Sequence, residues 1–100
     1  MLWAISCVDK PNTAAIREEH LVPHRSYLQS QKKILVLAGA TQSDDGQTAI
    51  GSLFVVNVNS RADARAFSDG DPFTKAGVFS SVTITRMRKG QWNPEACEGA

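Results

Sequence analysis

The chain has 100 residues, of which 42% are hydrophobic and 21% are charged, and its formal net charge is +1. This length corresponds to one domain, and the composition is that of a globular protein, which excludes disordered, collagen-like and coiled-coil chains. The near-neutral charge gives no electrostatic support for binding nucleic acid or an anionic membrane. No apolar run approaches the roughly 20 residues that span a bilayer. Because the first residues also lack the basic start of an export signal, we expect a cytoplasmic protein with no membrane or nucleic-acid partner.

The two cysteines, Cys7 and Cys97, fall in a predicted strand and in the C-terminal tail. They have no Cys-x-x-Cys spacing and no nearby histidine that would complete a zinc site. We therefore expect no bound metal and no disulfide, but one buried and one exposed thiol.

Residues 13–33 show a helical pattern, in which Leu21, His24, Arg25 and Leu28 are three to four residues apart and Tyr27 lies beside them. Pro23 removes a backbone donor and disfavours a helical residue before it. The sequence therefore predicts two helices, one ending near residue 20 and one beginning at Pro23. His24 would then lie in a first helical turn, where unpaired N–H groups and the helix dipole favour a neutral imidazole that can act as a base.

The rest of the chain predicts strands and one more helical region. Alternating or branched apolar runs indicate strands over 2–8, 34–40, 50–58 and 80–88. Asp44 and Asp45 are turn formers in the hairpin between the second and third strands. Residues 60–63 have the spacing of a capping box that opens a helix reaching about residue 68. Asp71 followed by Pro72 predicts the start of one further turn, which Gly77 ends.

The predicted order is βαββαβ, the ferredoxin-like α+β arrangement of a four-stranded antiparallel sheet with helices on one face. The other face of such a sheet is left uncovered and apolar, and a surface of that kind usually meets another protein. We therefore expect a homodimer, or a higher oligomer, that packs these faces together.

The sequence lacks the motifs of two classes of ligand, RNA and nucleotides. The aromatic stretch of an RNA-recognition motif is missing, and no glycine-rich phosphate loop is present. Among the titratable groups, only His20 and His24 change charge near neutral pH without help. His20 follows Glu18 and Glu19 and is interpreted as a solvated residue, whereas His24 shares a helical face with Leu28 and is directed toward the sheet.

Several blocks resemble the YciI-like (YCII-related) proteins over residues 1–89, leaving 90–100, with Trp92 and Cys97, as a tail of open role. The blocks are Leu-Trp-Ala-Ile-Ser-Cys-Val-Asp-Lys-Pro at residues 2–11, Pro-His-Arg-Ser-Tyr-Leu at 23–28, Ala-Gly at 38–39, Asp-Asp-Gly at 44–46, Gly-Ser-Leu at 51–53, and Ala66 with Asp-Gly-Asp-Pro-Phe-Thr-Lys-Ala-Gly-Val-Phe at 69–79. The resemblance implies a dimeric α+β barrel with a cleft in each subunit between sheet and helices.

The resemblance also implies an active site built on His24 and Asp71, with no metal and no organic cofactor. Relatives include a dehydrochlorinase of a chlorinated hydroxyhydroquinone, and muconolactone isomerase shares the broader fold. The hypothesis is a lyase or isomerase acting on a small aromatic or lactone-type molecule, with His24 as general base or acid and Asp71 orienting it. The residues expected to contact substrate are Arg17, Arg25, Tyr27, Gly39, Ser52 and Phe73.

The chain departs from the family pattern at Val22, where an arginine usually precedes the Pro-His block. Arg17 or Arg25 could replace that guanidinium as a bidentate partner of a carboxylate or phenolate. Competing interpretations remain open: Asp71 also suits a helix cap, and His24 could be a satisfied buried histidine. The alternative functions are a small-ligand-binding or accessory module without turnover and a purely structural dimerisation domain.

Overall fold

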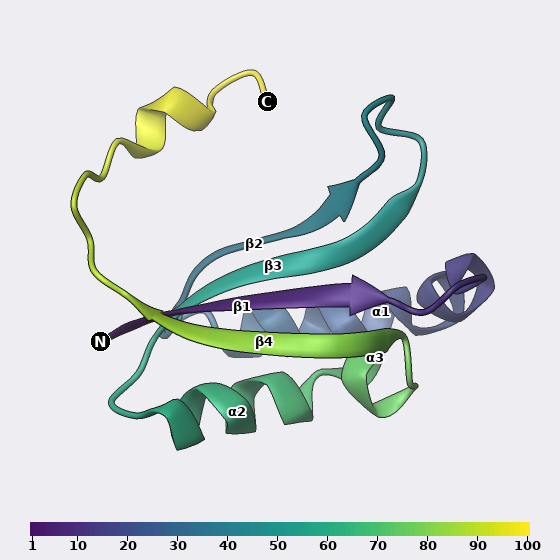
Figure 1. The fold of residues 1–100 in the computed structure, drawn as a ribbon, viewed down its shortest axis with the longest axis horizontal. Coiled ribbons are helices and arrows are strands. Elements are labelled where there is room, and N and C mark those ends of the chain that lie inside the picture. Colours follow the sequence, from purple (N-terminus) through teal and green to yellow (C-terminus); the bar gives the residue numbers. More distant parts are fainter.

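Four strands form one antiparallel sheet in the computed structural model, which describes all 100 residues (Figure 1). The strands are β1 (Leu2–Asp9), β2 (Leu35–Gln42), β3 (Ala49–Asn57) and β4 (Phe79–Met87), and their order across the sheet is β2-β3-β1-β4. Helices α1 (Ala14–Ser30), α2 (Arg61–Gly70) and α3 (Pro72–Lys75) pack on one face. The predicted ferredoxin-like fold is confirmed, with strand boundaries within two residues of expectation. None of the helices combines the length and apolar character needed to cross a bilayer.

The core lies between the helices and the alternate residues of the central strands that face them. On β1 these are Trp3, Ile5 and Cys7, all buried. Their neighbours on β3 and β4 include Phe54 and Ile84, which stand opposite Ile5 in the two antiparallel ladders. Ala64 and Phe67 of α2 complete this buried cluster together with Val56. The strand period of two thus places one apolar row against the helices.

The opposite face of the sheet is uncovered and carries a set of apolar residues beside the exposed Ser6, Ser81, Thr83 and Thr85. Its exposed or half-exposed hydrophobic residues are Leu2, Ala4, Val8, Val36, Leu37, Leu53, Val55 and Met87. Apart from Val36, which lies at the register shift of β2, they alternate along the strands with residues that face the helices. They therefore belong to the face that the helices of this chain leave uncovered (Figure 1). We call this set the open face.

Helix α1 is continuous, so the expected break before Pro23 is wrong. Proline leaves the carbonyl of the residue four positions earlier without its helical donor, which here is Glu19. Pro23 and Glu19 are both exposed, so water can satisfy that carbonyl. His24, on the buried side, packs under the sheet together with the half-buried Leu28. His24 therefore lies in the middle of a helix, and the expected help from unpaired N–H groups of a first turn is absent.

The two predicted helix starts after β3 form as expected. The Ser60 hydroxyl accepts a hydrogen bond from the backbone N–H of Asp63 at 3.1 Å and caps α2. The Asp71 carboxylate accepts from the backbone N–H of Phe73 at 2.9 Å and caps α3. Gly77 then turns the chain into β4 with φ +78, a conformation that glycine adopts without strain.

The two thiols differ in their surroundings, and this difference predicts their reactivity. Cys7 is buried and Cys97 exposed, as expected. Burial, followed by the nearby Asp71 and Asp9 carboxylates, raises the pKa of the Cys7 thiol to about 12. Because the thiolate is the reactive form, iodoacetamide at pH 8 is expected to alkylate Cys97 and leave Cys7 unmodified until the protein is denatured. Peptide mass spectrometry checks this, and rapid native labelling of Cys7 would contradict it.

Candidate functional site

The two candidate residues that are farthest apart in the sequence meet in the structure. The Nδ1 atom of His24, in α1, lies 2.7 Å from Oδ1 of Asp71, the residue before α3. Both side chains are largely buried, with exposed fractions of 11% and 2%. Since a carboxylate only accepts hydrogen bonds, Nδ1 carries the proton, and in the neutral ring Nε2 is left with the free lone pair. Nε2 has no hydrogen-bond partner in the protein.

Asp71 has two roles that do not exclude each other. Its Oδ1 atom receives both the His24 ring N–H and the Phe73 backbone N–H. Its Oδ2 atom is buried with no hydrogen-bond partner in the protein. A buried carboxylate with one bare oxygen is costly unless a positive charge lies beside it. Asp71 is therefore placed to stabilise an imidazolium that forms when Nε2 takes up a proton, in addition to capping α3.

The ring of Phe73 fixes the plane of the imidazole. The two rings are stacked, with centroids 3.8 Å apart and planes at 6°. The His24 ring also contacts Phe54 edge to face, with ring centroids 6.4 Å apart. Phe73 is held in turn because its backbone N–H donates to Asp71, the N-cap residue of α3, and because its side chain is buried. The imidazole is thus oriented by a hydrogen bond along one direction and by ring packing along another.

A cavity of about 250 Å³ adjoins this pair, between α1 and strands β2 and β3. Its walls are mainly apolar, and five of the six residues expected to contact substrate, together with His24, lie among them. The complete lining is Arg17, Leu21, His24, Arg25, Leu28, Ala38, Gly39, Ala40, Ser52, Phe54 and Phe73. An apolar pocket with a few convergent polar groups is typical of sites for small molecules.

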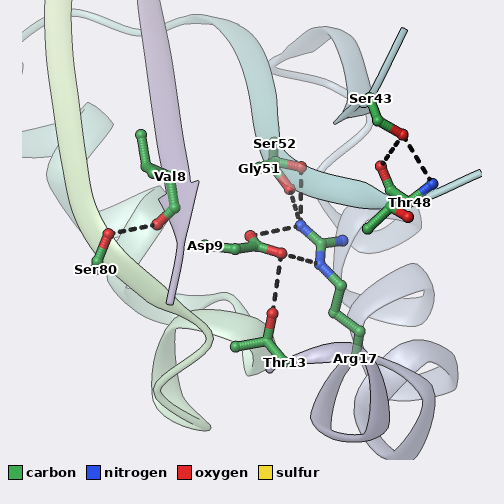
Figure 2. A network of polar contacts seen from close by, with 9 residues as sticks. All are labelled: Val8, Asp9, Thr13, Arg17, Ser43, Thr48, Gly51, Ser52 and Ser80. Atoms are coloured by element: carbon green, nitrogen blue, oxygen red, sulfur yellow. Dashed lines mark hydrogen bonds and ion pairs between the residues drawn. The ribbon is translucent and has the colours of Figure 1, made fainter. Parts of the chain in front are cut away.

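Arg17 is fixed in the wall by a network that Figure 2 shows. Its Nε and Nη2 atoms donate to the two carboxylate oxygens of Asp9 at 2.7 and 2.9 Å. Nη2 also donates to the Gly51 carbonyl at 2.8 Å and to the Ser52 hydroxyl at 3.2 Å, and Thr13 donates to Asp9. The guanidinium carbon lies 5.0 Å from the centroid of the Phe73 ring. Asp9 therefore compensates the charge of Arg17, whose Nη1 alone makes no hydrogen bond.

Arg25 is the uncommitted cation of the cavity. It is exposed, and neither a hydrogen bond nor an ion pair joins its side chain to the protein. Val22, where the family pattern has arginine, is 74% exposed. Of the two arginines that could replace that guanidinium, Arg25 is thus the one with its donors free.

Tyr27 does not line the cavity, in contrast to the expectation. Its hydroxyl donates to the carbonyl of Phe67 at 2.8 Å, and the ring packs beside Gly70, so it joins α1 to α2. Burial, and then the Asp71 charge, raise the pKa of this hydroxyl above its usual value. A side chain one position before Leu28 in the helix is simply turned toward α2. His20 contacts only Glu19, at 3.9 Å, which agrees with its solvated interpretation.

Sequence reasoning missed Asp9 and the small residues of β2. Asp9, to which the sequence assigns no role of its own, ends β1 and holds Arg17. Ala38 and Ala40 leave the room that the cavity occupies, and no local pattern marks them. No group of three or more histidine, cysteine or acidic side chains is placed to hold a metal ion.

Comparison with known proteins places these features in a family. The YCII-related domain model matches residues 1–88. An uncharacterized protein of Haemophilus influenzae is 27% identical over 97 residues, which cover 89% of this chain and 98% of that protein. The structure of 5-chloro-2-hydroxyhydroquinone dehydrochlorinase from Burkholderia phenoliruptrix, in complex with 2,5-dihydroxybenzoquinone, is similar with a TM-score of 0.82 and 29% identity. The match covers 90% of this chain and 96% of the dehydrochlorinase chain.

A more distant structure supports the fold only. A protein of Agrobacterium tumefaciens superposes with a TM-score of 0.54 at 15% identity, over 94% of this chain and 98% of its own. The match of the domain model to nearly nine-tenths of the chain, together with the ferredoxin-like sheet, shows that this protein belongs to the YCII-related family.

Proposed function

We propose that this protein is a lyase that removes HCl from a small chlorinated and hydroxylated ring, with His24 as the proton-transferring residue and Asp71 as its orienting partner. The observation that carries the proposal is the 2.7 Å contact between His24 Nδ1 and Asp71 Oδ1 at the wall of a cavity. The similarity to a dehydrochlorinase over 90% of the chain supports the reaction class.

The chemistry asked of His24 is modest. In the keto tautomer of the ring, where a hydroxyl proton has moved to the carbon that bears chlorine, Nε2 takes the proton of a second hydroxyl. The O–H electron pair then forms a carbonyl, the adjacent carbon–carbon double bond shifts to the chlorine-bearing carbon, and chloride leaves with the electron pair of the carbon–chlorine bond. The sum of the two is loss of HCl, so neither an oxidant nor a reductant is needed. The Asp71 carboxylate stabilises the imidazolium that forms, and it has a bare oxygen because its environment is otherwise apolar. Positioned proton transfer of this kind contributes roughly 10²- to 10⁴-fold in rate.

The size and lining of the cavity favour a single substituted ring. A dry cavity of about 150 Å³ accommodates benzene, and the cavity here is about 250 Å³. Leu21, Leu28 and Phe54 offer apolar surface, while Arg25 and Ser52 offer hydrogen-bond donors to oxygen substituents. This combination suits a polyhydroxylated benzene or its quinone better than a phosphorylated or peptide ligand.

Chloride release tests the proposal directly. The full-length protein is incubated with a panel of chlorinated hydroquinones and hydroxyhydroquinones, and chloride is measured by ion chromatography alongside quinone absorbance. The expected result is protein-dependent release of one chloride per ring converted. Calorimetric binding of 2,5-dihydroxybenzoquinone without chloride release from any member of the panel would instead support the non-catalytic binding module. If the protein neither binds the quinone nor releases chloride from any member of the panel, the proposed substrate class is wrong.

Arg25 is expected to contribute an oxygen contact to the bound ring. Replacing it in Arg25→Met removes the free guanidinium while retaining the aliphatic part, and should weaken binding of 2,5-dihydroxybenzoquinone by about tenfold, since charge-assisted hydrogen bonds exceed neutral ones. Isothermal titration calorimetry measures the change. Lys32→Met, which removes one charge outside the cavity, is the matched control, and equal affinities for the two variants would show that Arg25 does not contact the ligand.

We also propose that the protein is a homodimer in which two open faces pack together. The chain exposes 6708 Å², whereas a monomeric protein of this mass exposes about 5,500 Å². The excess, about 1,200 Å², is larger than the roughly 800 Å² that each partner buries in a standard interface, and the exposed segment after β4 contributes to it. The open face offers exposed apolar residues for such an interface, and closed two-fold symmetry makes the face its own partner.

A further inference from the structure

The segment after β4 stands apart from the rest of the chain. In Figure 1 residues 90–100, coloured yellow, leave the end of β4 beside the N-terminus and extend away from both sheet and helices. Every residue from Thr85 to Ala100 is exposed, and Trp92 is 55% exposed. The backbone hydrogen bonds of the segment, such as Ala96 N–H to Asn93, stay within it. The segment also lies beyond residue 88, where the match to the family ends.

We call residues 90–100 the arm. Its far end is acidic, whereas the end of β4 from which it starts is basic. The tip is the single turn η1 (Pro94–Cys97) together with the residue after it, and it carries Glu95 and Glu98. The base carries Arg86, Arg88 and Lys89, at the end of β4. None of these five charged side chains forms an ion pair in the protomer, although the two sets are only a few residues apart. Arm and base thus have complementary charges that the single chain leaves unused.

A cleft of about 1040 Å³ separates the start of the arm from the open face. It is lined by Met1, Leu2, Val36, Leu37, Val55, Asn57, Arg86, Met87, Arg88, Lys89, Gly90, Gln91 and Trp92. Most of the apolar part of this lining belongs to the open face, Met1 and Trp92 being the exceptions, and the basic residues without ion-pair partners contribute to the rim. An occupant therefore needs an apolar body and an acidic extremity, which a second copy of this chain supplies.

We infer that the two copies exchange their C-terminal arms: the acidic turn of each arm packs against the basic rim of the other, and Trp92 is buried between the subunits. A two-fold axis makes every such contact occur twice. The acidic turn of each copy therefore pairs with the basic rim of the other. The inference rests on the proposed homodimer and adds to it the segment that clamps it. It does not depend on the proposed reaction.

Charge reversal on the full-length chain tests the exchange. Sedimentation equilibrium gives the dimer dissociation constant of the wild type, of Glu95→Lys with Glu98→Lys, of Arg88→Glu with Lys89→Glu, and of the chain with all four changes. Each reversed pair is expected to weaken the dimer by about tenfold or more, since several exposed ion pairs are replaced by repulsions in duplicate. The fourfold change restores the opposite signs and should recover most of the wild-type affinity.

The controls separate this inference from the dimer itself. Glu18→Lys with Glu19→Lys alters the net charge as much as the reversed tip does, but on the exposed side of α1, and should leave the dissociation constant unchanged. If neither reversed pair changes the dimer dissociation constant, or if the fourfold variant dimerises as weakly as either pair alone, the arm exchange is wrong. The proposed dimer itself is not affected by that result. A wild type that is monomeric at all concentrations would overturn both, and the chloride assay would be unaffected by either outcome.

Trp92 provides an independent optical reading of the same event. Trp3 is buried in the core in any assembly state, so the difference spectrum between wild type and Trp92→Phe isolates the emission of Trp92. Burial between subunits predicts that this emission moves to longer wavelength when the protein is diluted below its dissociation constant. A Trp92 emission that is fully solvent-like at all concentrations would contradict the inference.

Discussion

His24→Gln is expected to lower the turnover number for chloride release by roughly 10²- to 10⁴-fold, the contribution of one positioned proton-transfer group. The glutamine amide can donate to Asp71 in place of the His24 ring N–H, but it supplies no base at the position of Nε2. Because the apolar walls and Arg25 remain, the dissociation constant of 2,5-dihydroxybenzoquinone should change by a much smaller factor. Steady-state kinetics of chloride release and calorimetry give the two numbers separately.

His20→Gln is the matched control, since His20 belongs to the same helix, contacts only Glu19 and is absent from the cavity lining. Its turnover number should equal that of the wild type. A His24→Gln protein that folds, binds the quinone and releases chloride at the wild-type rate would eliminate His24 as the proton-transferring residue. A loss of binding as large as the loss of turnover would assign His24 a packing role on Phe73 instead.

Asp71→Asn probes the partner without dismantling the fold. The amide oxygen still accepts from the Phe73 backbone N–H and from the His24 ring, so the cap of α3 survives, while the negative charge that stabilises the imidazolium is removed. Turnover should fall and the chain should remain folded. Nitrogen-15 NMR of the His24 ring reports whether the proton stays on Nδ1, which separates loss of charge from a change of tautomer.

The fold could be predicted from the sequence because its signals are local. The period of two in the strands, the hairpin turn between β2 and β3, and the caps at Ser60 and Asp71 each depend on a few neighbouring residues. The break predicted at Pro23 failed for the opposite reason. Whether proline interrupts a helix depends on which side of the helix faces solvent, and the sheet that decides this is distant in sequence.

The site was only partly predictable. His24 and Asp71 are 47 residues apart, and their contact is set by how α1 and α3 pack, so the residues alone supplied two candidates and the family resemblance supplied the pairing. The sequence could not show which arginine has its charge compensated, because the partner of Arg17 is Asp9 at the end of β1. A turn-forming aspartate and a strand-ending anchor have the same local sequence.

Gly51→Ala is expected to lower the free energy of unfolding by roughly 3 kcal/mol, at the upper end of the range for overpacked positions. A Cβ at this position of β3 would overlap the backbone carbonyl oxygen of Cys7 and approach the Thr41 hydroxyl to 2.6 Å. The hydroxyl can rotate away, but the Cys7 carbonyl is fixed, because Cys7 stands opposite Ser52 in the β1–β3 ladder. Urea unfolding followed by circular dichroism measures the loss.

Gly39→Ala provides the comparison within the same sheet, because a Cβ there meets nothing within 4 Å. Its free energy of unfolding should lie within about 0.5 kcal/mol of the wild type. The double variant Gly51→Ala with Thr41→Ala distinguishes the two obstacles, and it should remain as unstable as Gly51→Ala since the Cys7 backbone is the one that cannot move. Recovery of stability in the double variant would instead identify the Thr41 side chain as the obstacle. Because the Gly51 carbonyl accepts from Arg17, a β3 displaced by the new methyl group also moves the wall of the cavity. Weaker quinone binding should therefore accompany the lost stability.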